Sequence, residues 1–448
     1  MLNYGDWYGE RGTNWGNVEY DTQHALLLEY VRSGNPEAFF LAHATELHNR
    51  DVDTVHAAAD SRQRGGVHIH VIGHVGDYFE KAVPGFLGYV HGGFSVSHAW
   101  TEGHFAHYFL TGDRRSYETG CAVADYFARR DLSRPYDFFD CRVPGWHLIM
   151  MASAYHATGD PYYLNAASVV VERVLEAQDK APRPLPDYQA AGRKPFQQGG
   201  WSRMMVPGHC ECEPRHRGNA GFMVAVLLSG LKYYHDVTGD PRVKQSIIDG
   251  AHYLLDETYS DEVHGFRYTS CPKTAYRPGA SPLMVEGIAR AYLWTRDERF
   301  RRVLTEALPR DARGSSYGKG FSMYYRVGPR VLADLEAAGL KFDMVELLLR
   351  SRVRHPSLGA PGCRTKPDRG RDPLKHDAGA PPTVEIRAER SRELNHGATP
   401  SPGHAPGGLR ASSPAVAGLL QSGDESPRQL HRVRAGSLQT APGWPGSS

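Results

Sequence analysis

The stretch AYHATGDPYYLNAA (Ala154–Ala167) holds two helix-forming runs separated by the tetrapeptide ATGD (Ala157–Asp160). Glycine adopts the left-handed conformation that ends a helix, and an aspartate carboxylate caps the helix that follows. The pattern returns as LTGD (Leu110–Asp113) and VTGD (Val237–Asp240), and in weaker form as RSGN (Arg32–Asn35) and TRDE (Thr295–Glu298). Each such turn predicts a helical hairpin.

Apolar residues recur at helical spacing on both sides of these turns. We therefore predict an all-α fold of six sequential hairpins, the arrangement of a closed (α/α)6 toroid. The predicted helix pairs are 17–32 with 36–49, 95–110 with 114–130, 145–157 with 161–178, 218–237 with 241–259, 282–295 with 298–308, and 318–338 with 341–352. Strand-like alternation is scarce, with VHIHVIG (Val67–Gly73) as the main example.

The composition divides the chain into two parts. Only one aromatic residue, Trp444, lies beyond residue 354, whereas 13 of the 30 prolines fall within 355–448. A segment rich in Pro, Gly, Ser and Arg buries too little apolar area to offset its ordering entropy. We predict one toroid domain over 1–354 and a disordered tail over 355–448, which is either natural or an out-of-frame read of a GC-rich gene.

The charge balance limits the classes of partner. The 52 Lys and Arg residues oppose 50 Asp and Glu residues, which leaves a formal net charge of +2. We expect neither nucleic acid nor a membrane as partner, because the chain has no basic field and no apolar run of the roughly 20 residues that a span needs. The first residues, MLNYGDWYGE, lack the features of a signal peptide.

The short turns of a toroid share one rim, so the longer connections share the other. That second rim also carries the N-termini of the first helix of each hairpin, whose free amides favour anionic groups. The connections are 50–94, 131–144, 179–217, 260–281 and 309–317. Trp, His, Glu and Arg gather there, so this rim is the predicted functional site.

Several side chains on this rim suit a carbohydrate, because indole rings stack on sugar faces while carboxylates and imidazoles bind hydroxyls. The predicted substrate-binding residues are Trp15, Glu19, His98, Glu102, Trp146, Trp201 and Arg203. For each tryptophan a place in the core fits the sequence equally well. Glu19 also fits as a first-turn capping residue, as does Asp21, for which capping fits at least as well as a functional role.

The stretch GHCECEPRHRGN (Gly208–Asn219) suits a substrate that carries a carboxylate. Arginine binds a carboxylate bidentately, and histidine transfers protons near neutral pH. We predict that Arg217 and Asn219 neutralise the carboxylate, that His209 or His216 is the base, and that Tyr276 is the acid. We expect no metal or cofactor, because C-x-C is an atypical ligand spacing and no second cluster in the sequence completes a site.

Four longer strings resemble the central toroid of exo-rhamnogalacturonan lyase-like proteins, polysaccharide lyase family 26 and its bacterial relatives. The strings are NYGDWYGERGTNWGNVEYDTQHALLLEY, GGFSVSHAWTEGHFAHYFLTGDRR, CRVPGWHLIMMASAYHATGDPYYLNAA and GGWSRMMVPGHCECEPRHRGNAGFM. The resemblance, over roughly residues 3–340, implies cleavage of rhamnogalacturonan, an acidic polysaccharide, at galacturonate by β-elimination. It also implies β-rich domains on both sides of the toroid, which we do not expect in this chain.

Two other functions fit the same sequence. A glycoside hydrolase on this architecture would use two carboxylates, such as Asp21 and Glu102. A carbohydrate-binding protein without catalytic activity would use the same rim.

Overall fold

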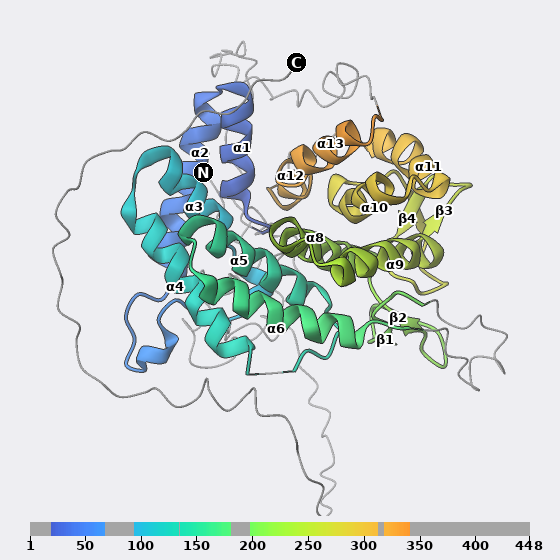
Figure 1. The fold of residues 1–448 in the computed structure, drawn as a ribbon, viewed down its shortest axis with the longest axis horizontal. Helices are drawn as coiled ribbons and strands as arrows, with labels where there is room; N and C mark the ends of the chain where they lie inside the picture. The colour runs from blue at the N-terminus through green and yellow to red at the C-terminus, as the bar shows by residue number, and fades with distance from the viewer. Residues whose placement is uncertain (1–18, 68–93, 134, 181–197, 312–317, 341–448) are drawn as a thin grey trace, which may run out of the picture. The chain divides into compact units, whose positions relative to one another are not determined.

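The computed structural model describes residues 19–67, 94–133, 135–180, 198–311 and 318–340 (Figure 1). Its α-helices are α1 (Thr22–Ser33), α2 (Pro36–His48), α3 (Glu102–Thr111), α4 (Arg114–Asp131), α5 (Arg142–Thr158), α6 (Pro161–Ala177), α8 (Gly221–Thr238), α9 (Pro241–Thr258), α10 (Pro282–Thr295), α11 (Glu298–Glu306), α12 (Gly318–Tyr325) and α13 (Gly328–Ala337). The strands are β1 (Arg203–Met204), β2 (Arg217–Gly218), β3 (Tyr259–Ser260), β4 (Gly265–Arg267) and β5 (Tyr276–Pro278). No helix within these ranges is long and apolar enough to span a membrane.

The predicted turns are confirmed. Gly112, Gly159 and Gly239 have φ of 76°, 69° and 67° at the ends of α3, α5 and α8. The aspartate after each of them accepts a hydrogen bond from the backbone amide two residues on, as Asp160 does from Tyr162 at 2.9 Å. The turn chemistry therefore sets the five hairpins from α1–α2 to α10–α11.

The first helices of the hairpins form a closed ring, which confirms the predicted (α/α)6 toroid. Each of α1, α3, α5, α8 and α10 contacts the next in that order, α10 contacts α12, and α12 contacts α1. The Thr22 and Ser322 hydroxyls are 2.7 Å apart at this last contact. The second helix of each of the first five hairpins packs against its own partner.

The sixth hairpin differs from the prediction of one helix over 318–338. The structure has two helices, α12 and α13, with a break at Arg326 and Val327. Pro329 has no amide to continue the hydrogen-bond ladder, and it stands in the first turn of α13, where none is needed. The predicted helix 341–352, the tail 355–448 and most of the predicted strand at 67–73 lie outside the described residues.

A buried ion pair lies inside the ring. Arg326, 2% exposed, donates a hydrogen bond of 2.7 Å from Nε to Oε2 of Glu102, at the start of α3, and its Nη2 atom lies 2.7 Å from the same oxygen. The Tyr233 hydroxyl donates to the other oxygen, and the Arg326 guanidinium lies 4.8 Å from the centre of the Trp146 ring. Burial acts to raise the pKa of Glu102, but the charges of Arg326 and His24 and the Tyr233 hydrogen bond together outweigh it, and the pKa falls below its usual value.

The Arg326→Met variant tests how much this ion pair contributes to the free energy of unfolding. It leaves the Glu102 carboxylate buried without its cation, so we expect the free energy of unfolding in urea to fall by about 3–5 kcal/mol. The control is Arg62→Met, which removes an exposed pair with Asp60 and should leave the unfolding midpoint unchanged. Equal midpoints for the two variants would contradict the role given to Arg326.

Candidate active site

The long connections on the second rim carry two small antiparallel sheets that the sequence did not predict. Strands β1 and β2 pair Arg203 with Gly218 and Met204 with Arg217. Strand β4 pairs with both β3 and β5. These sheets fix the loops that hold most of the predicted catalytic residues.

A pocket of about 520 Å³ opens beside strand β1, between the 131–144 connection and helix α6. Its lining residues are Ser133, Pro135, Tyr136, Phe138, Arg173, Glu176, Ala177 and Arg203. The Arg173 guanidinium lies 5.8 Å from the centre of the Tyr136 ring, and that of Arg203 lies 5.4 Å from the centre of the Phe138 ring. Two cations thus stand on either side of an aromatic pair whose ring centres are 5.9 Å apart.

Tyr136 is paired with a buried histidine. Its hydroxyl lies 2.6 Å from Nδ1 of His147, which is fully buried in α5. Burial, assisted by the charge of Arg173, lowers the pKa of His147 to about 3, and burial raises the pKa of Tyr136. At neutral pH the phenol therefore keeps its proton beside an uncharged imidazole.

Arg203 and Arg217 bind the same backbone carbonyl. Both donate to the Ser202 carbonyl, Arg203 at 2.8 Å and Arg217 at 3.3 Å, and Arg203 also donates to the Asp137 carbonyl at 3.1 Å. Backbone carbonyls carry no net charge, so these contacts orient Arg203 without neutralising it. Arg203 therefore brings positive charge to the pocket.

Asn219 requires a correction. Its side-chain amide donates to the carbonyls of Phe138 and Trp201 at 3.0 and 3.1 Å, and its oxygen accepts from the Ala220 amide at 2.9 Å. Both amide hydrogens are thus used, so the predicted binding of a substrate carboxylate does not fit. Asn219 instead ties two rim loops to the start of α8.

The predicted acid and bases lie apart. The His209 ring is half-buried with its centre 6.0 Å from that of Phe139, and burial lowers its pKa. His216 is 6% exposed, and its Nε2 lies 3.8 Å from a Glu257 carboxylate oxygen. Tyr276 stands on β5 with its ring 5.3 Å from the Arg267 guanidinium. His209 therefore packs on the residue that follows Phe138 of the pocket wall.

The other predicted binding residues are mostly buried, and this corrects the sugar-stacking roles of two of them. Trp201 is fully buried and donates its indole N–H to the Val174 carbonyl at 2.9 Å, and Trp146 is 1% exposed and stacks on Tyr20. Each ring face is already covered by protein. Glu19, His98 and Glu102 are buried at 0%, 8% and 9% exposure, and Trp15 lies outside the described residues.

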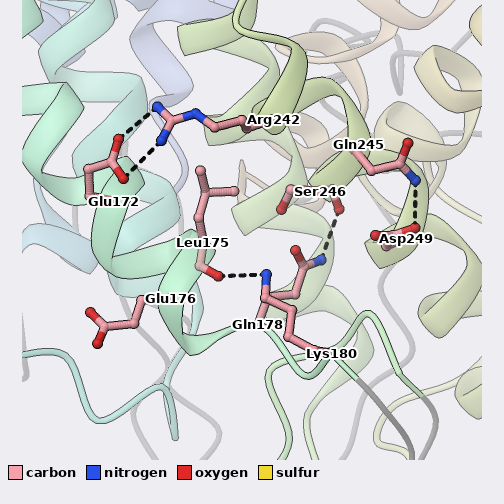
Figure 2. Close-up of a pocket in the computed structure, with 9 residues that line it drawn as sticks. All are labelled: Glu172, Leu175, Glu176, Gln178, Lys180, Arg242, Gln245, Ser246 and Asp249. Carbon is pink, nitrogen blue, oxygen red and sulfur yellow. Dashed lines mark hydrogen bonds and ion pairs between the residues drawn. The ribbon is translucent and has the colours of Figure 1, made fainter.

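A second pocket, of about 660 Å³, lies between α6 and α9 (Figure 2). Arg242 forms a two-pronged pair with Glu172 at 2.7 and 3.1 Å, and Gln178 donates to the Ser246 carbonyl at 3.0 Å. Lys180 donates to the Leu175 carbonyl at 2.9 Å. The charged group on which an acidic ligand would depend, Arg242, is already neutralised, so this pocket is the weaker candidate.

Two residues of the better pocket, Tyr136 and Arg173, and the buried His147 beside Tyr136 were not predicted from the sequence. His147 belongs to the rim string VPGWH (Val143–His147), which was a signal for it. Arg173 lies in the middle of the amphipathic helix α6 and carries no local signal. Tyr136 gains its role only from the histidine that folding places beside it.

No protein-family model and no curated protein matches the chain. Among solved structures it is similar to a polysaccharide lyase, with 13% identity and a TM-score of 0.47. The match covers 72% of this chain and 91% of that chain. It is also similar to an unsaturated glucuronyl hydrolase from Bacillus sp. GL1, with 14% identity and a TM-score of 0.43; the match covers 73% of this chain and 86% of that one. A glycosyl hydrolase family 88 protein from Bacteroides vulgatus has 12% identity and a TM-score of 0.45, and the match covers 73% of this chain and 92% of that one. At these values the likeness carries no argument about activity.

The depressed pKa of His147 predicts a pH dependence of stability. The unfolded chain takes up a proton on this residue near pH 6.5, while the folded protein does so only near pH 3. Stability is therefore lost as the pH falls through this window, by about 1.4 kcal/mol per pH unit. His147→Gln should remove about 2 kcal/mol of the loss measured by urea unfolding between pH 7 and pH 5.

The matched control is His156→Gln, an exposed position on the same helix, which should keep the wild-type pH dependence. If His147→Gln keeps it as well, the imidazole is not held neutral by the fold.

Proposed function

We propose that this chain is a polysaccharide lyase that cleaves rhamnogalacturonan or a related uronate-containing polysaccharide by β-elimination. The observation that carries the proposal is the pocket in which Arg173 and Arg203 stand on either side of Tyr136 and Phe138. It joins positive charge, aromatic surface and a proton donor in a space of about 520 Å³.

Each of these features meets a need of the reaction. The C5 proton of a uronate is only weakly acidic, so a cation must neutralise the adjacent carboxylate as the carbanion forms. Arg203 supplies this charge, supported by Arg173 and by Arg217 through the shared Ser202 carbonyl. The phenol of Tyr136 protonates the departing O4 oxygen, and His147 holds that phenol in place.

We assign the base that removes the C5 proton to His209. A base must be uncharged before it accepts the C5 proton, and burial keeps the pKa of His209 below its ordinary value. Its ring packs on Phe139, the residue that follows the pocket wall. His216, buried beside Glu257, has the supporting position, and Tyr276 is replaced by Tyr136 as the acid.

Substitution of the pocket residues tests this assignment. Tyr136→Phe and Arg203→Met should each lower kcat/KM on rhamnogalacturonan by about 10²–10³, because each removes a group needed in the transition state. The measurement is the ultraviolet absorbance of the unsaturated uronate that elimination creates.

Two controls match these variants in chemistry. Tyr162→Phe changes an exposed tyrosine on α6, and Arg242→Met changes the arginine of the second pocket. Neither should change the rate by more than about twofold. A loss confined to Arg242→Met would place the site in the second pocket instead.

A glycoside hydrolase is the second candidate, because the pKa values of Asp21 and Glu102 are shifted in opposite directions from their usual values. Burial, together with the Glu102 charge, raises the pKa of Asp21, whereas Arg326 brings the pKa of Glu102 below its usual value. Such a split is typical of an acid and its ionised partner. Their cavity has no room for a water molecule, whereas the lyase pocket has a volume of about 520 Å³, and this difference favours the lyase pocket.

Product chemistry separates the two reactions. A lyase acting on a saturated polysaccharide gives new reducing ends together with the ultraviolet absorbance of a C4–C5 double bond. We expect both signals to rise in parallel, and reducing ends without the absorbance would sink the lyase proposal. Binding without either product would instead support a carbohydrate-binding protein.

A further inference from the structure

Three cysteines from two rim connections meet in a small buried cluster outside the pocket. Cys210 and Cys212 come from the loop between β1 and β2, and Cys271 comes from the loop between β4 and β5. They are 4%, 6% and 1% exposed, and their sulfur atoms all lie within 4.8 Å of one another. The sequence analysis rejected a metal here because it found no second cluster, and Cys271 is the missing member.

The sulfur spacing separates two chemical interpretations. Sγ of Cys212 lies 3.7 Å from Sγ of Cys271, far from the roughly 2.05 Å of a disulfide. Two corners of a tetrahedron with zinc–sulfur bonds of about 2.3 Å are about 3.8 Å apart. The observed spacing therefore matches thiolates around a zinc ion. An odd number of thiols also leaves one without a disulfide partner.

The backbone around the cluster is arranged for thiolates. The His216 amide donates to Sγ of Cys210 at 3.1 Å. The backbone amides of Lys273 and Glu211 are hydrogen-bonded to the Cys271 sulfur. Amide donors directed at sulfur are the outer contacts that stabilise a metal-bound thiolate.

We propose that Cys210, Cys212 and Cys271 bind a zinc ion through their three sulfur atoms, with water at the fourth position. Binding forms three zinc–sulfur bonds and releases the remaining thiol protons to solvent. The site then carries one net negative charge, and Lys273, which donates from Nζ to the Glu211 carbonyl at 2.7 Å, lies close enough to offset it.

The ion would join two loops that also contact each other through hydrogen bonds. The Thr269 hydroxyl donates to the His209 carbonyl at 3.0 Å, and the Ser270 and Asn219 backbones are linked at 3.0 Å. Because the first loop leads from His209 to Arg217, zinc would fix the positions of these two residues of the proposed lyase site. The site is a structural metal centre, and its test does not depend on lyase activity.

Metal content and a cobalt spectrum test the proposal on the whole chain. Protein purified with a thiol reductant and without chelator should contain about one zinc per chain. After a chelator removes the zinc, Co²⁺ should restore a near-ultraviolet thiolate-to-cobalt band and the visible bands of a tetrahedral ion. Because this experiment uses the wild-type chain, it remains decisive if a variant fails to fold.

Variants then assign the ligands. Cys212→Ser and Cys271→Ser should each lose the stoichiometric zinc and weaken the charge-transfer band by about a third or more. Cys121→Ser, on α4 and outside the cluster, should keep both, with circular dichroism confirming the fold of all three. No zinc after reconstitution, zinc retained in both cluster variants, or a Cys212–Cys271 disulfide in protein purified without reductant would each overturn the proposal.

Discussion

The pairing of Arg326 with Glu102 is the interaction on which the toroid depends. These residues are 224 positions apart, so the pair joins the end of the ring to its second hairpin. Arg330 continues the network, with its guanidinium 3.6 Å from the centre of the Tyr233 ring and a 2.7 Å bond to Glu286. A closed ring of helices has one seam, and here a network of buried charges lies at that seam.

The same network explains why the carboxylates at the start of α1 and α3 are not accessible. Asp21 caps α1 through the His24 amide at 3.2 Å and also accepts from the Gly103 amide at 3.1 Å. The Asp21 carboxylate thus sets the N-terminal ends of α1 and α3, while the Glu102 carboxylate accepts from Arg326 and Tyr233. The side chains that line a pocket, such as Arg203 and Tyr136, lie instead on the connections between the hairpins.

Close packing between α5 and α8 positions those connections. A Cβ at Gly230 would lie 2.4 Å from the Gly145 carbonyl oxygen, so both glycines are needed for the approach of the two helices. His147 follows Gly145 by two residues, and Asn219 precedes α8. The two sides of the candidate site are therefore held at a distance that this helix contact sets.

The sequence alone determined the hairpins, because a glycine and an aspartate at a turn act through backbone conformation and hydrogen bonds within a few residues. It also located the rim and the arginines of β1 and β2. It failed at the sixth hairpin, where Pro329 divides the helix, and at Asn219, Trp146 and Trp201, whose types suit sugar binding and core packing equally well.

Only the tertiary structure decided which of these side chains are open and which are buried. Tyr136 acquires its histidine from α5, Arg173 reaches the pocket from α6, and Cys271 joins cysteines about sixty residues earlier in the chain. Burial and the distance between remote residues have no local signature, because they depend on how the ring closes. The helices follow from the order of residues, whereas the candidate site follows from their packing.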